Sequence, residues 1–441
     1  SAAASFNPAH RLIDQHVETA VINGGISRAQ AEREAVELYR VLRLPNPETI
    51  GQRYPHQVSG GQLQRVMTAM AMACHPDLII FDEPTTALDV TTQIEVLAAI
   101  RDAVKTFGSA ALYISHDLAV VAQMADRIMV LRHGKLVEEA DTRSMLSQPQ
   151  QDYTKSLWAV RSFRTEPKAC PVAQVPLLEV CQACASYGLQ PVLHGVSMQL
   201  YRGQTLAVIG ESGSGKSSTA RLITGLLPAT AGQVLYDGEA LPVDFRRRSK
   251  EQLRRIQMIY QIPDTALNPR QRIVDIIGRP LTFYLGLKGK AMRARVAELL
   301  EMIELDPAVF MERQPRELSG GQKQRICIAR ALAADPQLII CDEVTSALDQ
   351  LVAEGVLKLL NRLQQQLGVA YLFITHDVAT VRAIADEVLV MQRGRVVDQG
   401  SRNAIFTPPY QAYTGLLFSS EPEMDPDWLD HLLAQRAAPT V

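Results

Sequence analysis

The stretch that decides the fold is TLAVIGESGSGKSSTARLITGLL, residues 205–227. Its first five residues form an apolar run typical of a buried strand, and the residues from Ser218 onward are typical of a helix. Between them lies the motif G-x-x-x-x-G-K-S, in the strand, loop and helix context that this motif requires. Because glycines let backbone amides point inward around phosphate oxygens, the stretch predicts a polyphosphate site. The alternative is a chance glycine-rich turn, but the strand, loop, lysine and helix all agree with the phosphate site.

The chemistry of the loop follows from its side chains. Lys216 can reach the outer phosphates of a bound polyphosphate, and the Ser217 hydroxyl can bind magnesium. The amino end of the following helix adds positive potential to the same place. The predicted phosphate-binding residues are Gly210, Glu211, Ser212, Gly213, Ser214, Gly215, Lys216, Ser217 and Ser218.

Two adjacent acids follow a second buried strand, residues 338–341. Asp342 ends this strand, where a carboxylate beside the loop can hold magnesium through water. Glu343 is placed to orient or deprotonate an attacking water. A solvated strand end would be the simpler explanation of Asp-Glu alone, but a phosphate loop in the same module favours catalysis.

Four short motifs occur twice along the chain, and the two copies are always 260 residues apart. They are Ser59-Gly60-Gly61-Gln62 and Ser319-Gly320-Gly321-Gln322, Asp82-Glu83 and Asp342-Glu343, Ala87-Leu88-Asp89 and Ala347-Leu348-Asp349, and His116-Asp117 and His376-Asp377. A constant offset over four motifs predicts a duplicated domain. The glycine-rich loop, in contrast, occurs only once.

The strands and helices expected around both sets of motifs alternate, which predicts two α/β domains in tandem. We expect residues 1–161 to be the carboxyl-terminal part of a first domain that lacks the loop, and 177–418 to be a complete second domain. Residues 162–176 have no periodicity and contain prolines, as a linker would. Residues 419–441 are acidic and proline-containing, so we expect a mobile tail. We favour a fragment over a truncated gene, since half a core would leave sheet edges and apolar faces uncovered.

The composition narrows the class of protein. The 45 basic and 47 acidic residues nearly cancel, and the pI is about 6.5, so no overall basic field favours nucleic acid. No apolar run approaches the length needed to span a bilayer. The six scattered cysteines fit reduced thiols. Cys181 and Cys184 form a C-x-x-C pair, but on the expected strand they should face opposite sides, which disfavours a metal site.

These motifs in this order resemble the nucleotide-binding domains of ABC transporters. The resemblance covers all but the linker and tail, and it implies P-loop NTPase domains, each with a RecA-like core and a helical subdomain. In that family two domains pair head to tail, so each ATP lies between the phosphate loop of one domain and the Ser-Gly-Gly-Gln motif of the other. For this chain the resemblance implies a pseudo-dimer of its own two domains. It also implies ATP and Mg2+ as ligands.

Carried over residue by residue, the resemblance gives each matching position a role. Glu343, His376 and Gln261 would be catalytic, and Ser217, Gln261 and Asp342 would contact the metal. Tyr187 would stack on adenine, although a core tyrosine is an equally good interpretation. Ser59, Gly60, Gly61 and Gln62 would complete the site from the first domain, although a serine helix cap would also explain this motif.

Further features resemble one branch of the family, the ATP-binding subunits of oligopeptide, dipeptide and nickel importers. They are the stretch from Asp264 to Pro269 and the Tyr-Thr pairs at residues 153–154 and 413–414. This branch implies two transmembrane permease subunits, a periplasmic solute-binding protein as an indirect partner, and a peripheral location at the cytoplasmic face of the bacterial inner membrane. Some relatives carry a four-cysteine cluster near the end of a module. Here only Cys170 lies there, so an iron-sulfur site is not expected.

Two other classes of protein compete with this interpretation. A soluble tandem ATPase acting on ribosomes or DNA would need a long charged linker or an inserted zinc-binding or arm domain, whereas the linker here is short and carries too little net charge to bind a polyanion. An inert scaffold is the second alternative, and Lys216 and Glu343 argue against it for one site only.

Overall fold

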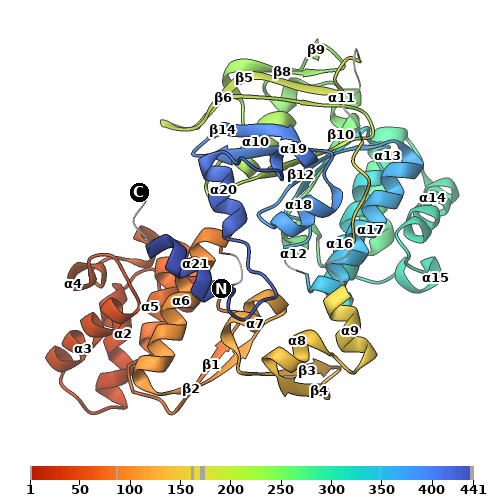
Figure 1. Cartoon of the computed structure of the whole chain (residues 1–441). Coiled ribbons are helices and arrows are strands. Elements are labelled where there is room, and N and C mark those ends of the chain that lie inside the picture. Colours follow the sequence, from red (N-terminus) through yellow and green to blue (C-terminus); the bar gives the residue numbers. More distant parts are fainter. Residues whose placement is uncertain (1, 86–87, 160–162, 169–173, 347, 438–441) are drawn as a thin grey trace. The chain divides into compact units, whose positions relative to one another are not determined.

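The computed structural model describes residues 2–85, 88–159, 163–168, 174–346 and 348–437. The chain divides into two compact units. Figure 1 colours both by residue number, from red at the N-terminus to blue at the C-terminus. Unit 1 comprises Ser1–Trp158 with Ser419–Val441, and unit 2 comprises Ala159–Phe418. Ala87, Ala347 and Cys170, which belong to the motifs and clusters considered above, lie outside the described residues.

Unit 2 is built on a six-stranded sheet in the order β10-β11-β12-β7-β13-β14. Its strands are β7 (Thr205–Ile209), β10 (Ile256–Ile259), β11 (Leu338–Asp342), β12 (Ala370–Ile374), β13 (Glu387–Gln392) and β14 (Arg395–Ser401). All neighbours pair in parallel except β13 and β14, which form a hairpin. Every residue of β7, β11 and β12 is buried, as expected for parallel strands covered on both faces.

An antiparallel sheet in the order β6-β5-β8-β9 accompanies this core. Its strands are β5 (Leu178–Tyr187), β6 (Gln190–Leu200), β8 (Ala229–Tyr236) and β9 (Glu239–Ala240). Apolar residues of β5, β6 and β8 share one hydrophobic cluster with residues of β7, β11 and β12. The two sheets therefore enclose a common core.

The helices of unit 2 fall in four groups along the chain. They are α10 (Lys216–Thr224) and α11 (Lys250–Arg255); α12 (Pro263–Ala266), α13 (Ile273–Leu285), α14 (Gly289–Met302) and α15 (Pro307–Phe310); α16 (Gly320–Leu332), α17 (Gln350–Leu367) and α18 (Val378–Ile384); and α19 (Arg402–Ile405) and α20 (Ala412–Ser419). Helices α13, α14, α16 and α17 pack together with β11 and β12 in a second large cluster. This cluster corresponds to the helical subdomain and its attachment to the core.

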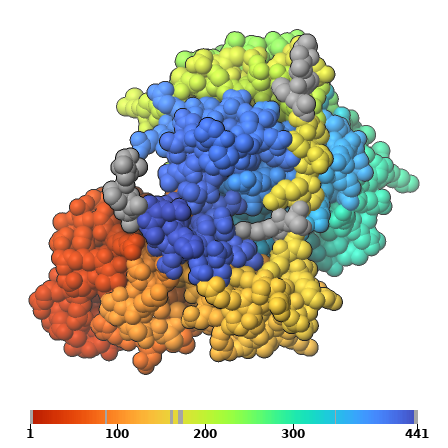
Figure 2. All heavy atoms as spheres, viewed as in Figure 1, coloured from red at the N-terminus to blue at the C-terminus, as the bar shows by residue number. Residues whose placement is uncertain are grey.

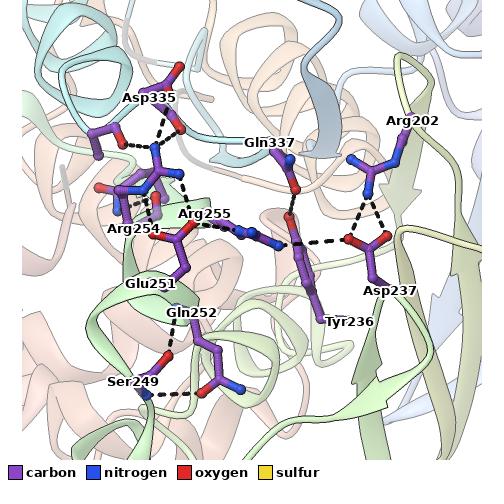
Figure 3. Close-up of polar contacts among 12 residues, drawn as sticks. Arg202, Tyr236, Asp237, Ser249, Glu251, Gln252, Arg254, Arg255, Asp335 and Gln337 are labelled. Carbon is purple, nitrogen blue, oxygen red and sulfur yellow. Dashed lines mark hydrogen bonds and ion pairs between the residues drawn. The ribbon is translucent and has the colours of Figure 1, made fainter. Parts of the chain in front are cut away.

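A polar network holds the starts of β10 and β11 beside β8 (Figure 3). Tyr236 donates its hydroxyl hydrogen to Gln337 Oε1 over 2.6 Å, and Arg254 pairs with Asp335 at 2.8 Å. Glu251 accepts hydrogen bonds from Arg254 and Arg255, which lower the pKa of this carboxyl to about 2. The network fixes β10 in register next to β11, and both strands end at the candidate site.

Unit 1 repeats part of this plan. Its strands are β1 (Leu78–Asp82), β2 (Ala110–Ile114), β3 (Arg127–Arg132) and β4 (Lys135–Asp141); β1 and β2 pair in parallel, and β3 and β4 form a hairpin. Its helices are α1 (Ala2–Ser5), α2 (Leu12–Ile22), α3 (Arg28–Val41), α4 (Pro47–Ile50), α5 (Gly60–Met72), α6 (Val90–Phe107), α7 (Leu118–Met124), α8 (Thr142–Ser147), α9 (Asp152–Ala159) and α21 (Trp428–Ala437). Helices α2, α3, α5 and α6 share one apolar cluster with β1.

Two expectations differ from the structure. Cys181 and Cys184 do not face opposite sides of their strand, because a bulge with Gln182 at φ 46° shifts the alternation and leaves both half-buried. The tail, expected to be mobile, contains α21 packed against unit 1, because its apolar side chains find a matching face there. Figure 2 shows the dark blue tail lying against the orange part of this unit.

None of the helices in the described part of the chain is long and apolar enough to cross a membrane.

Candidate functional site

The candidate site lies at the carboxyl-terminal edge of the parallel sheet in unit 2. Strands β10, β11, β12 and β7 are neighbours and run in the same direction, so their carboxyl ends meet at one edge. The segments that follow these four strands carry Gln261, the pair Asp342 and Glu343, His376, and the glycine-rich loop. Open α/β sheets place ligands at this edge. The sheet topology thus collects residues that are up to 166 positions apart in the sequence, from Gly210 to His376.

The loop between β7 and α10 depends on its glycines. Gly210 has φ 147°, and an added Cβ would lie 2.2 Å from the Met391 carbonyl oxygen. Gly215 has φ 106°, and its Cβ would lie 2.9 Å from the Leu193 side chain. Around Gly213, at φ 78°, the space is open. Side chains at the first two positions would therefore displace the loop, while the third leaves room for a ligand to approach the backbone.

Two polar groups of the loop are arranged to receive an anion. The Lys216 ammonium donates to the carbonyl oxygens of Gly210 and Glu211, at 2.7 and 2.8 Å, so it folds back over its own loop. The Ser214 hydroxyl is buried and has no hydrogen-bond partner. A buried polar group without a partner is costly. Phosphate oxygens in the loop would give both groups acceptors, so these residues fit a polyphosphate.

Ser217 and Asp342 bring two oxygen donors together beside the loop. The Ser217 hydroxyl donates to Asp342 Oδ1 over 3.0 Å. Burial raises the pKa of Asp342, and the hydrogen bond from Ser217 opposes this effect. A hydroxyl and a carboxylate are ligands that suit Mg2+, which takes its remaining ligands from water and substrate phosphates. Among the described residues no group of three or more His, Cys, Asp and Glu side chains could hold a metal ion.

Glu343 is held by three neighbours at the end of β11. Its Oε2 accepts a hydrogen bond from Gln261 Nε2 at 2.6 Å, and His376 Nδ1 lies 3.3 Å from its Oε1. Its backbone has φ 52°, and its amide donates to the Ile374 carbonyl oxygen at 2.9 Å. A left-handed backbone at a glutamate is uncommon and turns the side chain out of the strand direction. The carboxylate is thus fixed between the ends of β10 and β12.

The Glu343 and His376 pair has coupled proton affinities. Burial alone would raise the pKa of Glu343, but the hydrogen bond and charge of His376 lower it below the ordinary value. For His376 burial opposes the charged form, and the contact with Glu343 raises its pKa above the ordinary value. An ionised Glu343 is the form that can accept a proton from water. The contact with His376 therefore keeps the Glu343 carboxylate ionised at neutral pH.

Tyr187 ends β5 and is 43% exposed, so it is not a core tyrosine. Its hydroxyl accepts a hydrogen bond from Arg221 of α10 at 2.9 Å. The Tyr413 hydroxyl accepts a hydrogen bond from the Glu211 amide of the loop at 3.1 Å. Arg221 and Tyr413 thus contact candidate site residues, and the sequence analysis named neither as a candidate. For Tyr413 there was a signal, since it belongs to one of the two Tyr-Thr pairs; for Arg221 there was none.

Unit 1 contains the matching acid and histidine. Glu83 has φ 50°, and its Oε1 lies 2.7 Å from His116 Nδ1. The His116 amide also donates to this oxygen, at 3.0 Å. Unit 1 therefore reproduces the arrangement at the end of β11 and β12, although the described part of unit 1 has no glycine-rich loop beside it.

Both Ser-Gly-Gly-Gln motifs begin a helix. Ser59 caps α5 and Ser319 caps α16, each in a capping box with the glutamine three residues later. A Cβ on Gly61 would lie 2.1 Å from Thr92, and one on Gly321 would lie 2.4 Å from Val352. The second glycine is therefore required by packing against α6 or α17, whereas Gly60 is not crowded. The helix cap is present in both copies, and it leaves the helix amino end available for an anion.

The structure thus brings Lys216, Ser217, Gln261, Asp342, Glu343 and His376 together in unit 2. Ser59, Gly60, Gly61 and Gln62 belong to unit 1. Their pairing with the loop of unit 2, and every individual role, stays a prediction.

Comparison with known proteins gives the family. The family model described as ABC transporter matches residues 3–86 and 193–346. The glutathione import ATP-binding protein GsiA of Escherichia coli strain K12 is 39% identical, over 96% of this chain and 73% of the relative. The protein of the same name from Shigella dysenteriae serotype 1 shows the same values.

Two solved structures are also similar. CbiO1 of Clostridium perfringens, part of the ABC transporter complex CbiONQ, has a TM-score of 0.48 and 28% identity, over 53% of this chain and 91% of that chain. The ADP- and phosphate-bound dimer of the ATP-binding cassette MJ0796 has a TM-score of 0.46 and 28% identity, over 51% and 98%. The family model and the identity to GsiA decide the assignment: the chain belongs to the ABC transporter family and is one of its ATP-hydrolysing subunits.

Proposed function

We propose that this protein powers the import of a small peptide-like solute, using ATP bound between the loop of unit 2 and the Ser59–Gln62 motif of unit 1. The observation that carries the proposal is the meeting of Lys216, Asp342 and Glu343 at one edge of the sheet. The identity to glutathione import proteins over nearly the whole chain supports the solute class. Two membrane permeases and a solute-binding protein are the partners that such a system needs.

Each residue of unit 2 has a part in the proposed reaction. The loop amides and Lys216 hold the β- and γ-phosphates, for which Lys216 exchanges its contacts to Gly210 and Glu211. Ser217 and Asp342 would hold Mg2+, which would supply positive charge to offset the negative charge of the phosphates. Glu343 orients the attacking water and accepts its proton, while Gln261 and His376 fix the Glu343 carboxylate.

Unit 1 contributes the opposing half of the proposed site. The amino end of α5, with Ser59 and the uncrowded Gly60, presents backbone amides to the γ-phosphate. ATP would draw the two units together, and hydrolysis would release them. Such a cycle would move permeases located at the inner membrane, with the protein bound peripherally at the cytoplasmic face.

Nucleotide binding tests the site. Lys216→Ala should weaken MgATP binding about 10- to 100-fold, because a charge-assisted hydrogen bond contributes about 1.5–3 kcal/mol. The control is Lys290→Ala, which removes an exposed lysine of α14. Titration with a fluorescent ATP analogue measures both. Equal affinity of Lys216→Ala and the unmodified protein would refute the assignment of the loop.

Transport tests the solute class. The protein, combined in vesicles with permeases and a solute-binding protein of a glutathione or dipeptide import system, should support uptake of labelled glutathione or dipeptides only when Glu343 is intact. Turnover stimulated by ribosomes or DNA instead of by the permeases would favour the soluble alternative.

A further inference from the structure

We propose that residues 420–436 are a docking segment through which the chain of unit 2 is tied to unit 1 by a second connection, besides residues 159–176. The two units are joined covalently twice, since the chain passes from unit 1 to unit 2 after Trp158 and returns after Phe418. The returning segment is not loose. It ends in α21, which packs against helices α6 and α7 of unit 1 (Figures 1 and 2).

The apolar part of this surface lies on α6 and α7. Trp428, Leu429 and Leu432 of α21 are buried in one cluster with three residues of unit 1, namely Ile94, Leu97 and Val120. Burial of a large apolar side chain stabilises by about 1.5–3 kcal/mol. Without α21 this face would be an apolar surface on an otherwise amphipathic helix pair.

A buried glutamine makes the docking specific. The Gln123 amide donates to the carbonyl oxygens of Glu423 and Asp425, at 2.8 and 2.5 Å. Its Oε1 accepts from the Leu429 amide at 3.0 Å. One side chain of α7 therefore satisfies three backbone groups of the segment, which fixes the register of α21.

Charge complementarity surrounds this contact. Arg101 of α6, whose side chain is 15% exposed, pairs with Asp430 at 2.5 Å. Arg143 pairs with Asp427 through two contacts of 2.8 and 2.9 Å. The acidic composition of the tail thus serves recognition of two arginines of unit 1.

The segment around Thr165, between the two domains, packs on α18 of unit 2, the helix that corresponds to α7 of unit 1. Thr165 donates through its amide and its hydroxyl to the Ala383 carbonyl oxygen of α18, at 2.8 and 3.0 Å. The Arg402 guanidinium donates to the Thr165 carbonyl oxygen at 2.6 Å. Ala383 is the residue 260 positions after Gln123. The chain that leaves each domain therefore docks on the same helix of the other domain, so the exchange is reciprocal.

A second connection raises the effective concentration of one unit near the other. It favours renewed pairing of the Ser59–Gln62 motif with the loop of unit 2 after each reopening. This consequence for turnover rests on the proposed function, whereas the docking itself does not.

Fluorescence tests the docking in the full chain. Trp158 and Trp428 are the two tryptophans of the sequence, so Trp158→Phe makes Trp428 the sole emitter. In this background Arg101→Glu should increase acrylamide quenching of Trp428 about twofold or more, as should Asp430→Arg, and the combined reversal should restore it. Arg40→Glu is the matched control, because Arg40 is an exposed arginine of α3 paired with Glu48. The docking would be overturned if acrylamide quenched Trp428 in the Trp158→Phe protein as strongly in buffer as in urea. It would also be overturned if neither Arg101→Glu nor Asp430→Arg changed the quenching.

Two further measurements complete the test. Light scattering at two protein concentrations should give a monomer with Trp428 protected; protection only in a dimer would mean that a second copy supplies the segment. ATP turnover at subsaturating ATP should fall about threefold in Arg101→Glu and recover in the double reversal. Released Trp428 with unchanged turnover would overturn the consequence for the cycle while leaving the docking intact. Loss of turnover in Lys216→Ala with Trp428 still protected would confirm that docking is independent of the ATP site.

Discussion

The two units contain the same helix and strand pairs, but the faces of their sheets differ. Ile80 and Leu112 of unit 1 are 60% and 46% exposed, whereas their counterparts Ile340 and Leu372 in unit 2 are fully buried. In unit 2 these residues pack against the antiparallel sheet and α10. The described part of unit 1 has no such layer. The comparison shows that equivalent apolar strand residues can be buried or exposed, depending on whether another layer covers that face of the sheet.

The two units also differ in what surrounds their acid and histidine pairs. Glu83 and Glu343 have matching backbones and histidine partners, but a phosphate loop lies beside Glu343, whereas the described residues of unit 1 contain none beside Glu83. The acid and histidine pair is therefore part of the local fold of both units, whereas the proposed catalysis also requires the loop.

The largest expected difference between the two units is the effect on ATP turnover of substituting Glu343 or Glu83. Glu343→Gln should lower ATP turnover about 100-fold or more, because it removes the proposed base but keeps the side-chain volume. Glu83→Gln should change turnover less than about twofold, because no glycine-rich phosphate loop lies beside Glu83 in the described part of unit 1. Steady-state hydrolysis of the purified chain measures both. Equal losses would show that unit 1 takes part in hydrolysis, and an unchanged rate in Glu343→Gln would remove the catalytic assignment.

A smaller effect concerns the two sheet faces. Ile340→Ala should destabilise unit 2 by about 3 kcal/mol, as expected when a fully buried aliphatic side chain is truncated. Ile80→Ala should cost less than about 1 kcal/mol, because its side chain is largely exposed. Hydrogen exchange of the strand amides in urea separates the units. A large cost at Ile80 that grows with protein concentration would indicate that another molecule covers this face.

The smallest effect is the pH dependence of the Glu343 and His376 pair. The pKa of His376 is raised above its ordinary 6.5, so its stabilising contribution is complete below 6.5 and is lost as pH rises through the folded-state pKa. The pKa of Glu343 is lowered from 4.5, so its contribution is present above 4.5 and is lost as pH falls through the folded-state pKa. The pair should therefore stabilise the folded state most between pH 4.5 and pH 6.5.

The measurement is a thermal melt at several pH values. His376→Asn should lower Tm by about 2 °C at pH 6 and by less at pH 9. In a Glu343→Gln background the same substitution should show little change with pH. A Tm difference that increases toward pH 9 would contradict the assigned direction.

Much of the fold followed from local pattern. The constant offset of the motifs, the buried strand before Gly210 and the helix after it all depend on residues close in sequence, and the family comparison confirms the tandem ABC-type fold. The docking of α21 could not be foreseen, because its apolar residues are few and their partners lie more than 300 positions away. The bulge at Gln182 likewise depends on pairing with neighbouring strands.

By itself, the sequence determined the identity of the groups: a glycine-rich loop with Lys216, an acid pair and a histidine in a repeated order. Their chemistry is a property of residue type and short-range spacing, which sequence records directly. Only the tertiary structure decided that four parallel strands deliver these groups to one edge, that Ile80 is exposed where Ile340 is buried, and that the tail returns to unit 1. These features depend on which distant segments share a surface, and burial and contact at such surfaces are set by the packing of layers.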